Sequence, residues 1–184
     1  MNLPNKISLV RICMVPVFVV LALMEMQWAQ YAALAVFCIA SATDFLDGQI
    51  ARRRNLVTNF GKFIDPIADK LLVMSALVVL VGQGRMPSWV CIVMLAREFA
   101  VSGFRLVAAG SGRVIAAGWL GKIKTVSQMA AVILLMLFTS PDGTAPLGET
   151  GRTIAQVVMY FSAAMTLVSG VDYIARNFDC IRDM

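Results

Sequence analysis

Residues 44–69 read DFLDGQIARRRNLVTNFGKFIDPIAD and contain four of the eleven acidic residues of the chain. In a helix, Asp44 and Asp47 lie on one face because they are three residues apart, and Asp65 and Asp69 share a face at a spacing of four. Pro66 falls in the first turn or so of the second helix, where a missing N–H is least harmful. The segment therefore predicts two antiparallel helices whose aspartates can face each other near a short loop.

The apolar character of the rest of the chain predicts a membrane protein. Of the 184 residues, 59% are hydrophobic and only 15% are charged, whereas soluble domains have about 45–50% and about 25%. Too few polar residues remain to cover a globule in water, so we expect lipid to surround the chain. The length suits one membrane-embedded domain over residues 1–184.

Six apolar stretches are long enough to cross a bilayer, which needs about 20 helical residues. Turn-forming residues separate the stretches, for example Gly82–Pro87 and Pro141–Pro146. The expected fold is all-α and integral to the membrane, a bundle of six transmembrane helices. The predicted spans are residues 7–26, 29–51, 61–82, 87–109, 117–139 and 152–175.

The lysines and arginines collect on one side of this arrangement, and cytoplasmic loops are the ones rich in these residues. Only Arg85 and Arg152 fall on the other side, while Arg97 lies inside the fourth span, where we expect an ion pair with Glu98. Both termini are therefore predicted to be cytoplasmic. The residues on the basic side are Lys6, Arg11, Arg52, Arg53, Arg54, Lys62, Lys70, Arg105, Arg113, Lys122, Lys124, Arg176 and Arg182.

Single charged residues at the ends of membrane spans are common anchors, but a group of four carboxylates calls for another explanation. They could be neutralised by Arg52, Arg53 and Arg54 alone, but like charges that share a site stay ionised only when a cation binds between them. The chain has no histidine, so carboxylates must carry any metal or acid–base chemistry. Hard oxygen ligands favour Mg²⁺ or Mn²⁺, and a pair of such divalent ions is the expected cofactor.

The spacing of these residues resembles the signature of the CDP-alcohol phosphotransferase family, D-x2-D-G-x2-A-R-x8-G-x3-D-x3-D. Every fixed position is met. The resemblance implies six transmembrane helices, usually paired as a homodimer, in agreement with the number of spans predicted above. The matching residues are Asp44, Asp47, Gly48, Ala51, Arg52, Gly61, Asp65 and Asp69.

Within the family, the chain is most similar to bacterial members that transfer a phosphatidyl group from CDP-diacylglycerol to sn-glycerol 3-phosphate. The similarity covers nearly the whole chain and includes residues 3–11, 65–70, 96–98 with Arg105, and 121–125 with Gln128. It implies a place in the bacterial cytoplasmic (inner) membrane, with the active site at the cytoplasmic face.

The resemblance also implies roles for individual residues. Asp44, Asp47, Asp65 and Asp69 would hold the two metal ions, with Asp69 as general base and Asp65 beside it in the catalytic centre. The cytidine-diphosphate site would consist of Asn5, Asp44, Gly48, Ala51, Arg52, Thr58 and Gly61. The acceptor phosphate would bind to Arg105, Arg113, Lys124 and Arg176.

Other functions remain open at this point. Relatives with the same signature use inositol phosphate, serine or phosphatidylglycerol as acceptor. An ion-coupled transporter could use the aspartates as an ion site, although transporters tend to place such groups near the middle of the membrane. A membrane protein without catalytic activity could recruit acidic lipids through the basic side. Nucleic-acid binding is not expected, because the basic residues form short clusters between apolar runs.

Overall fold

The chain folds into six helices over the residues that the computed structural model describes, which are 3–54, 59–110, 118–139 and 146–177. For residues 3–8, 44–54, 59–66, 68, 69 and 109 it describes the course of the backbone alone. These helices are the six that the apolar stretches predicted. Their bounds are α1 Leu3–Leu23, α2 Gln27–Arg54, α3 Asn59–Gly82, α4 Ser88–Gly110, α5 Trp119–Phe138 and α6 Gly148–Arg176.

Two bounds differ from the prediction in an informative way. Helix α2 continues through Arg54, three residues past the predicted end of the span, so the basic cluster extends the helix beyond its apolar part. Helix α3 begins at Asn59, two residues before the predicted start of the span. Pro66 therefore lies past the first turn of α3, further inside the helix than predicted.

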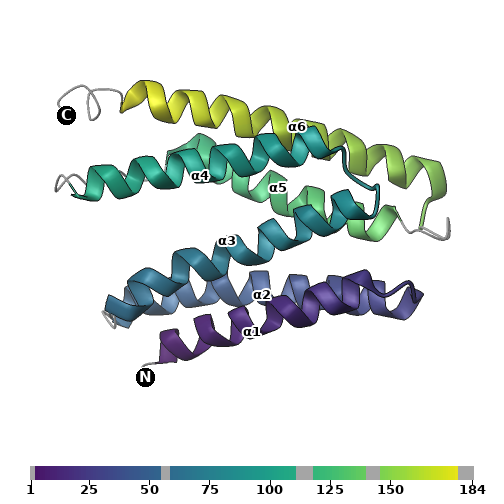
Figure 1. The fold of residues 1–184 in the computed structure, drawn as a ribbon, viewed down its shortest axis with the longest axis horizontal. Coiled ribbons are helices and arrows are strands. Elements are labelled where there is room, and N and C mark those ends of the chain that lie inside the picture. The colour runs from purple at the N-terminus through teal and green to yellow at the C-terminus, as the bar shows by residue number, and fades with distance from the viewer. Residues whose placement is uncertain (1–2, 55–58, 111–117, 140–145, 178–184) are drawn as a thin grey trace.

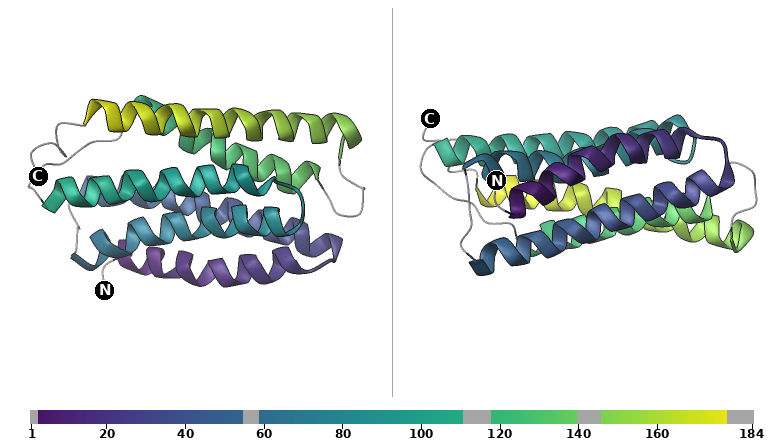
Figure 2. Two further views of the ribbon diagram at one scale, coloured as in Figure 1. Left: turned by 45° about the horizontal axis from the view of Figure 1, so that its top comes forward. Right: turned by 90° about the horizontal axis from the view of Figure 1, so that it is seen from below.

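The helices run up and down along one direction, so that each is antiparallel to the next (Figures 1 and 2). Helix α1 starts and α6 ends at the same end of the bundle (Figure 1). This end, called the aspartate end below, also holds the end of α2 and the start of α3. The opposite end, called the far end, holds the turn between α3 and α4, where Gly84 adopts a positive φ of 68° that favours glycine.

A continuous apolar core joins all six helices. Phe18 of α1 and Phe37 of α2 are fully buried, with ring centroids 5.8 Å apart. Helix α6 packs along α5 through mainly small residues, including Gly151, Ala155 and Ala163. Small residues let helix backbones approach closely where lipid supplies no hydrophobic driving force between helices.

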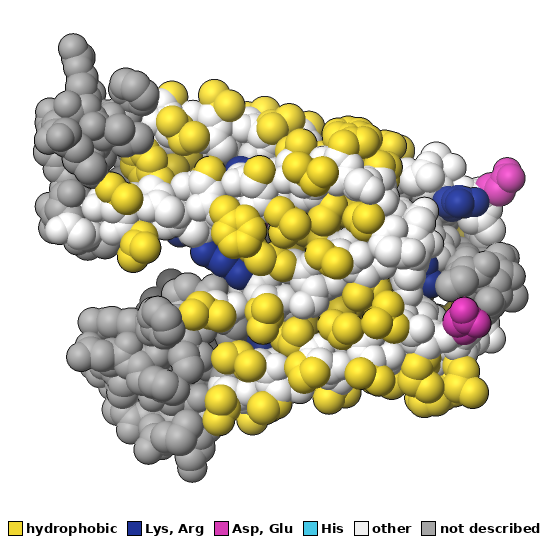
Figure 3. All heavy atoms as spheres, in the orientation of Figure 1, with side chains coloured by type: hydrophobic (Ala, Val, Ile, Leu, Met, Phe, Trp, Pro, Cys, Tyr) yellow, Lys and Arg dark blue, Asp and Glu magenta, His cyan; other side chains and the backbone are white. Residues whose placement is uncertain are grey.

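Hydrophobic side chains are spread over the described helices on the face that Figure 3 shows. Large exposed side chains occur on every helix, among them Val20, Ile39, Val78, Leu106, Trp119 and Val171. Helices α5 and α6 are long and apolar enough to cross a membrane, and Leu9–Leu23 and Lys70–Gly82 are shorter apolar helical segments. An apolar surface of this extent suits lipid rather than water.

Side chains tie the helices together at the far end. Gln30, which is 8% exposed, donates hydrogen bonds to the carbonyl oxygens of Ala22 (2.8 Å) and Met24 (2.9 Å), and accepts one from Arg85 (3.1 Å). Gln83 also donates to the Ala22 carbonyl. This far-end clasp joins the turn between α1 and α2 to the turn between α3 and α4, and it satisfies carbonyl groups that the end of α1 leaves open.

Candidate active site

The predicted metal ligands lie on two neighbouring helices at the aspartate end. Asp44 and Asp47 fall in the last part of α2, while Asp65 and Asp69 fall in the first half of α3. The two helices are in contact and antiparallel, as the sequence predicted. Four carboxylates on such a hairpin are a donor set that suits Mg²⁺ or Mn²⁺. Their side chains lie outside the described residues, so their mutual approach stays a prediction.

The side chains of the predicted cytidine-diphosphate residues also lie outside the described part of the structure, so their approach to a nucleotide stays a prediction. Thr58 lies outside the described residues. The others are described by their helical backbone alone, and all lie toward the aspartate end. They are Asn5 on α1, Gly48, Ala51 and Arg52 on α2, and Gly61 on α3.

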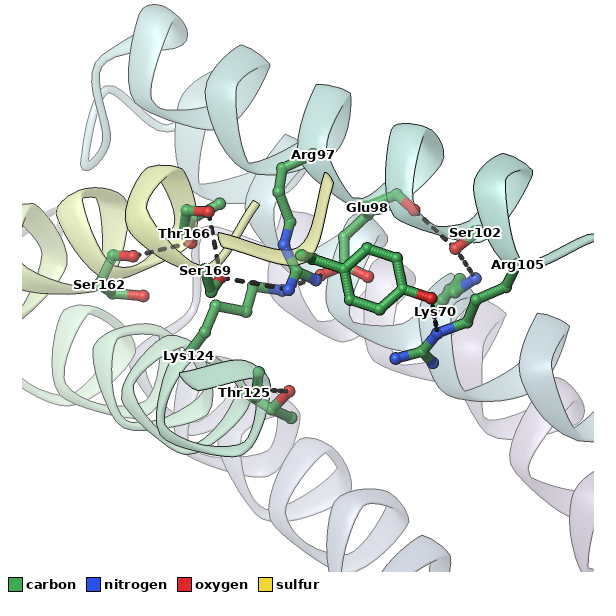
Figure 4. A network of polar contacts seen from close by, with 12 residues as sticks. Lys70, Arg97, Glu98, Ser102, Arg105, Lys124, Thr125, Ser162, Thr166 and Ser169 are labelled. Carbon is green, nitrogen blue, oxygen red and sulfur yellow. Dashed lines mark hydrogen bonds and ion pairs between the residues drawn. The ribbon is translucent and has the colours of Figure 1, made fainter. Parts of the chain in front are cut away.

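Beside this hairpin, charged side chains from α4 and α5 form a buried cluster (Figure 4). The carboxylate of Glu98 forms an ion pair with the ammonium group of Lys124 from α5. The same carboxylate lies 3.4 Å from a guanidinium nitrogen of Arg97, which confirms the ion pair expected within α4. The side chains of Lys124, Arg97 and Glu98 are only 3%, 13% and 19% exposed. One acid thus faces two cations in surroundings that screen charge weakly.

Helix α6 supplies the other wall around Arg97. The guanidinium donates a hydrogen bond to the Ser169 hydroxyl (3.1 Å). A Cβ atom added at Gly170 would lie 3.0 Å from Cγ of Arg97, and one added at Gly121 of α5 would lie 3.9 Å from its guanidinium. The absence of a side chain at Gly170 therefore lets the Arg97 stem lie directly against α6.

The cluster continues toward α3 through a serine of α4. Ser102 donates to the carbonyl oxygen of Glu98 (2.6 Å) and receives a hydrogen bond from the ammonium group of Lys70, which directly follows Asp69 in the chain. Figure 4 shows Lys124 reaching the Glu98 carboxylate, while Lys70 reaches Ser102 one turn further along α4. The hairpin that carries the aspartates is thus connected to the buried cluster.

The predicted acceptor-phosphate residues have different environments. Lys124 is 2% exposed and paired with Glu98. Arg105 donates a hydrogen bond to the Tyr173 hydroxyl (3.2 Å) and lies over its ring, 5.3 Å from the centroid. Arg176 is exposed and paired with Asp172 at 2.7 Å. Arg113 lies outside the described residues.

At the aspartate end the surface is hollowed between the two groups of helices, and Lys and Arg side chains lie at the inner end of this hollow (Figure 3). Deeper in the bundle, a cavity of about 60 Å³ lies between α3, α4 and α5. Its polar lining is Lys70, Glu98, Lys124, Thr125 and Gln128. Its apolar lining is Val73, Met74, Leu77, Leu95 and Met129.

Sequence reasoning had missed Ser102, although its spacing carried a signal. It lies four residues after Glu98 and three before Arg105, on the same face of α4 as these two predicted residues. On α6 a polar stripe runs along an otherwise apolar helix. It consists of Ser162, Thr166, Ser169 and Tyr173.

The described residues form an all-helical bundle with many apolar side chains on its exterior, which is typical of a membrane protein. Residues 1–168 match the family model described as CDP-alcohol phosphatidyltransferase. The match spans most of the chain, and the chain belongs to this family.

Curated relatives are similar to this chain over about three quarters of their length or more. A CDP-diacylglycerol–glycerol-3-phosphate 3-phosphatidyltransferase of Bacillus subtilis is 44% identical, with 98% of this chain and 97% of the relative covered. A protein of the same name from Rickettsia typhi is 38% identical, with 94% of each chain covered. Another from Escherichia coli is 39% identical over 73% of this chain and 76% of its own.

Proposed function

We propose that the chain transfers the phosphatidyl group of CDP-diacylglycerol to sn-glycerol 3-phosphate, giving phosphatidylglycerophosphate and CMP. The observation that carries this proposal is the 44% identity to the Bacillus subtilis enzyme over 98% of the chain. The complete aspartate signature supports the chemistry, and the buried cations support a phosphorylated acceptor.

In the proposed reaction, the free primary hydroxyl of the acceptor attacks the phosphorus that carries the diacylglycerol. A new P–O bond forms, the P–O bond to CMP breaks, and CMP leaves. The hydroxyl proton passes to the Asp69 carboxylate, because a chain without histidine must use another base. Asp69 is suited by its place in α3, directly before Lys70 and the cavity.

Asp44, Asp47, Asp65 and Asp69 would hold two Mg²⁺ or Mn²⁺ ions, which neutralise phosphate oxygens and the charge on the departing CMP. Arg52 is proposed to contact the diphosphate, since a guanidinium matches phosphate oxygens geometrically. The rest of the cytidine-diphosphate site is proposed to consist of Asn5, Asp44, Gly48, Ala51, Thr58 and Gly61. The small residues Gly48, Ala51 and Gly61 allow a nucleotide to approach the helix backbone closely.

Lys124 and Arg105 are the described residues best suited to bind the acceptor phosphate. Lys124 lines the cavity between α3, α4 and α5 and is held by Glu98, and Arg105 on α4 is held by Tyr173 of α6. Arg176 and Arg113 are proposed as outer contacts. The ion pair of Arg176 with Asp172 is exposed and therefore weak, so it can give way to a dianion.

We also propose that the six helices all cross the bacterial inner membrane, with both termini and the active site on the cytoplasmic side. The excess of Lys and Arg at the aspartate end supports this orientation. A homodimer is proposed from the family resemblance, and the mass of the protein–detergent complex tests it.

The first experiment measures CMP release by the purified protein in detergent, with CDP-diacylglycerol and Mg²⁺ and one acceptor at a time. We expect release with sn-glycerol 3-phosphate and none with serine, inositol phosphate or phosphatidylglycerol. If CMP is released with only serine, inositol phosphate or phosphatidylglycerol, the proposed phosphatidyl transfer stands, but sn-glycerol 3-phosphate is not the acceptor. Solute uptake into sealed vesicles without CMP formation would instead support a transporter.

The role of Asp69 is tested with Asp69→Asn. Loss of the base is expected to slow CMP release by about 10²–10⁴-fold. Glu149→Gln is the matched control, because it also turns an acid into an amide, in an exposed position at the far end. Release by Asp69→Asn at the rate of the control would rule out Asp69 as base.

A further inference from the structure

Gln128 is a buried polar side chain without a use in the mechanism above. It lies on α5, is 3% exposed and lines the cavity between α3, α4 and α5. Its side-chain nitrogen has no hydrogen-bond partner. An unsatisfied buried donor costs free energy, and buried polar groups are normally paired. This unpaired amide in a cavity wall indicates that a ligand completes its hydrogen bonds.

The other lining groups define the chemistry of such a ligand. The Glu98 carboxylate can only accept a hydrogen bond, while the Gln128 amide offers a free donor. A hydroxyl group serves both, because it donates and accepts at once. The deeper walls, formed by Leu77, Leu95 and Met129, suit C–H groups rather than charge. The cavity therefore suits a short carbon chain that bears a hydroxyl.

The size of the cavity is compatible with a short chain. Its volume of about 60 Å³ is several times the roughly 10–15 Å³ that one water molecule needs. The cavity is partly open, so the carbon chain of a small polyol can enter it while the polar ends of the molecule lie outside. The cavity starts beside Lys70, the residue after the proposed base Asp69.

We propose that this cavity binds the glycerol part of the acceptor, and that Gln128 determines specificity by donating a hydrogen bond to its secondary hydroxyl. The proposal rests on the function proposed above. Glu98 accepts the hydrogen of the same hydroxyl while it stays paired with Lys124. The phosphate stays with the cations nearer the aspartate end, and the primary hydroxyl points toward Asp69.

The test compares two acceptors that differ in this hydroxyl alone, sn-glycerol 3-phosphate and 3-hydroxypropyl phosphate. The full chain in detergent is assayed for CMP release, and kcat/KM is measured for each. A site that pairs with a hydroxyl rejects the analogue without it. We expect the wild-type protein to prefer glycerol 3-phosphate by at least about 100-fold. A wild-type ratio near one overturns the proposal without any variant.

Gln128→Met removes the amide and keeps a side chain of similar length. We expect the ratio of kcat/KM for sn-glycerol 3-phosphate to kcat/KM for 3-hydroxypropyl phosphate to fall about 10- to 100-fold. The fall should come from a lower kcat/KM for sn-glycerol 3-phosphate, with the value for the analogue unchanged. Gln156→Met is the control, because Gln156 is exposed on α6; it should keep the wild-type ratio. An equal loss on both acceptors, or an unchanged ratio, overturns the role of Gln128.

The outcomes also separate this inference from the proposed function. A wild-type protein that uses glycerol 3-phosphate, with a ratio that does not depend on Gln128, refutes only the cavity assignment. A wild-type protein that releases CMP with a different acceptor alone refutes both.

Discussion

Replacing Glu98 by glutamine removes the only described carboxylate that faces both Arg97 and Lys124. The amide keeps the shape of the side chain but leaves two cations without a counter-charge. Removing one partner of a buried ion pair costs about 3–5 kcal/mol. We expect a value near the lower limit, about 3 kcal/mol, because the glutamine oxygen still accepts a hydrogen bond. For a chain of this length, that corresponds to a fall of roughly 6–12 °C in Tm.

The assay is thermal unfolding of the purified protein in one detergent, followed by circular dichroism. Glu149→Gln serves as control and should leave Tm nearly unchanged, because exposed substitutions have small effects. The decisive variant combines Glu98→Gln with Lys124→Met. Replacing both partners of a buried pair is often neutral, so the double variant should recover at least half of the loss. A double variant that loses the sum of the two single losses would refute the charge-pairing argument.

Three other predictions concern glycines and the metal ions. Gly151→Ala should lower Tm by several degrees, because its Cβ would lie 2.7 Å from the carbonyl oxygen of Pro146; Gly103→Ala, which meets nothing within 4 Å, should raise it slightly through better helix propensity. Gly170→Ala should lower kcat/KM for sn-glycerol 3-phosphate, because the added Cβ at 3.0 Å from Arg97 displaces this side chain and with it the paired Glu98, which lines the cavity; a kcat/KM equal to that of the wild-type protein would refute the packing argument. Excess EDTA should abolish CMP release and added Mg²⁺ or Mn²⁺ should restore it; release that persists in EDTA would exclude the metal proposal.

The positions of the helices could be predicted from the sequence because they depend on residues close together in the chain. The long apolar runs and the turn residues between them predicted all six helices, and every observed bound lies within four residues of the predicted one. Several of the largest of these differences arise where polar residues continue a helix past its apolar part. Helix α6 starts at Gly148, four residues early, and Glu149 in its first turn is favourable beside the helix N-terminus.

The buried cluster was predicted only where its members are neighbours in sequence. Arg97 and Glu98 are adjacent, so their ion pair was expected, whereas Lys124 joins them only because α5 and α4 both pack against α6 and the long Lys124 side chain reaches Glu98. Periodicity shows which face of a helix a residue occupies but not which helix covers that face. The signature spacing, by contrast, placed the aspartates on α2 and α3 because those helices are joined by a short loop.

The far-end clasp has a mechanical consequence. Gln30, Gln83 and Arg85 tie the turn between α1 and α2 to the turn between α3 and α4, at the end remote from the aspartates. A rigid tilt of α3 that keeps these hydrogen bonds must therefore turn about this end. Helix α3 has 24 residues and is about 36 Å long, so a tilt of about 5° would move its other end by about 3 Å. Such a tilt would widen the aspartate end by roughly the width of an oxygen atom and leave the residues near the clasp almost in place.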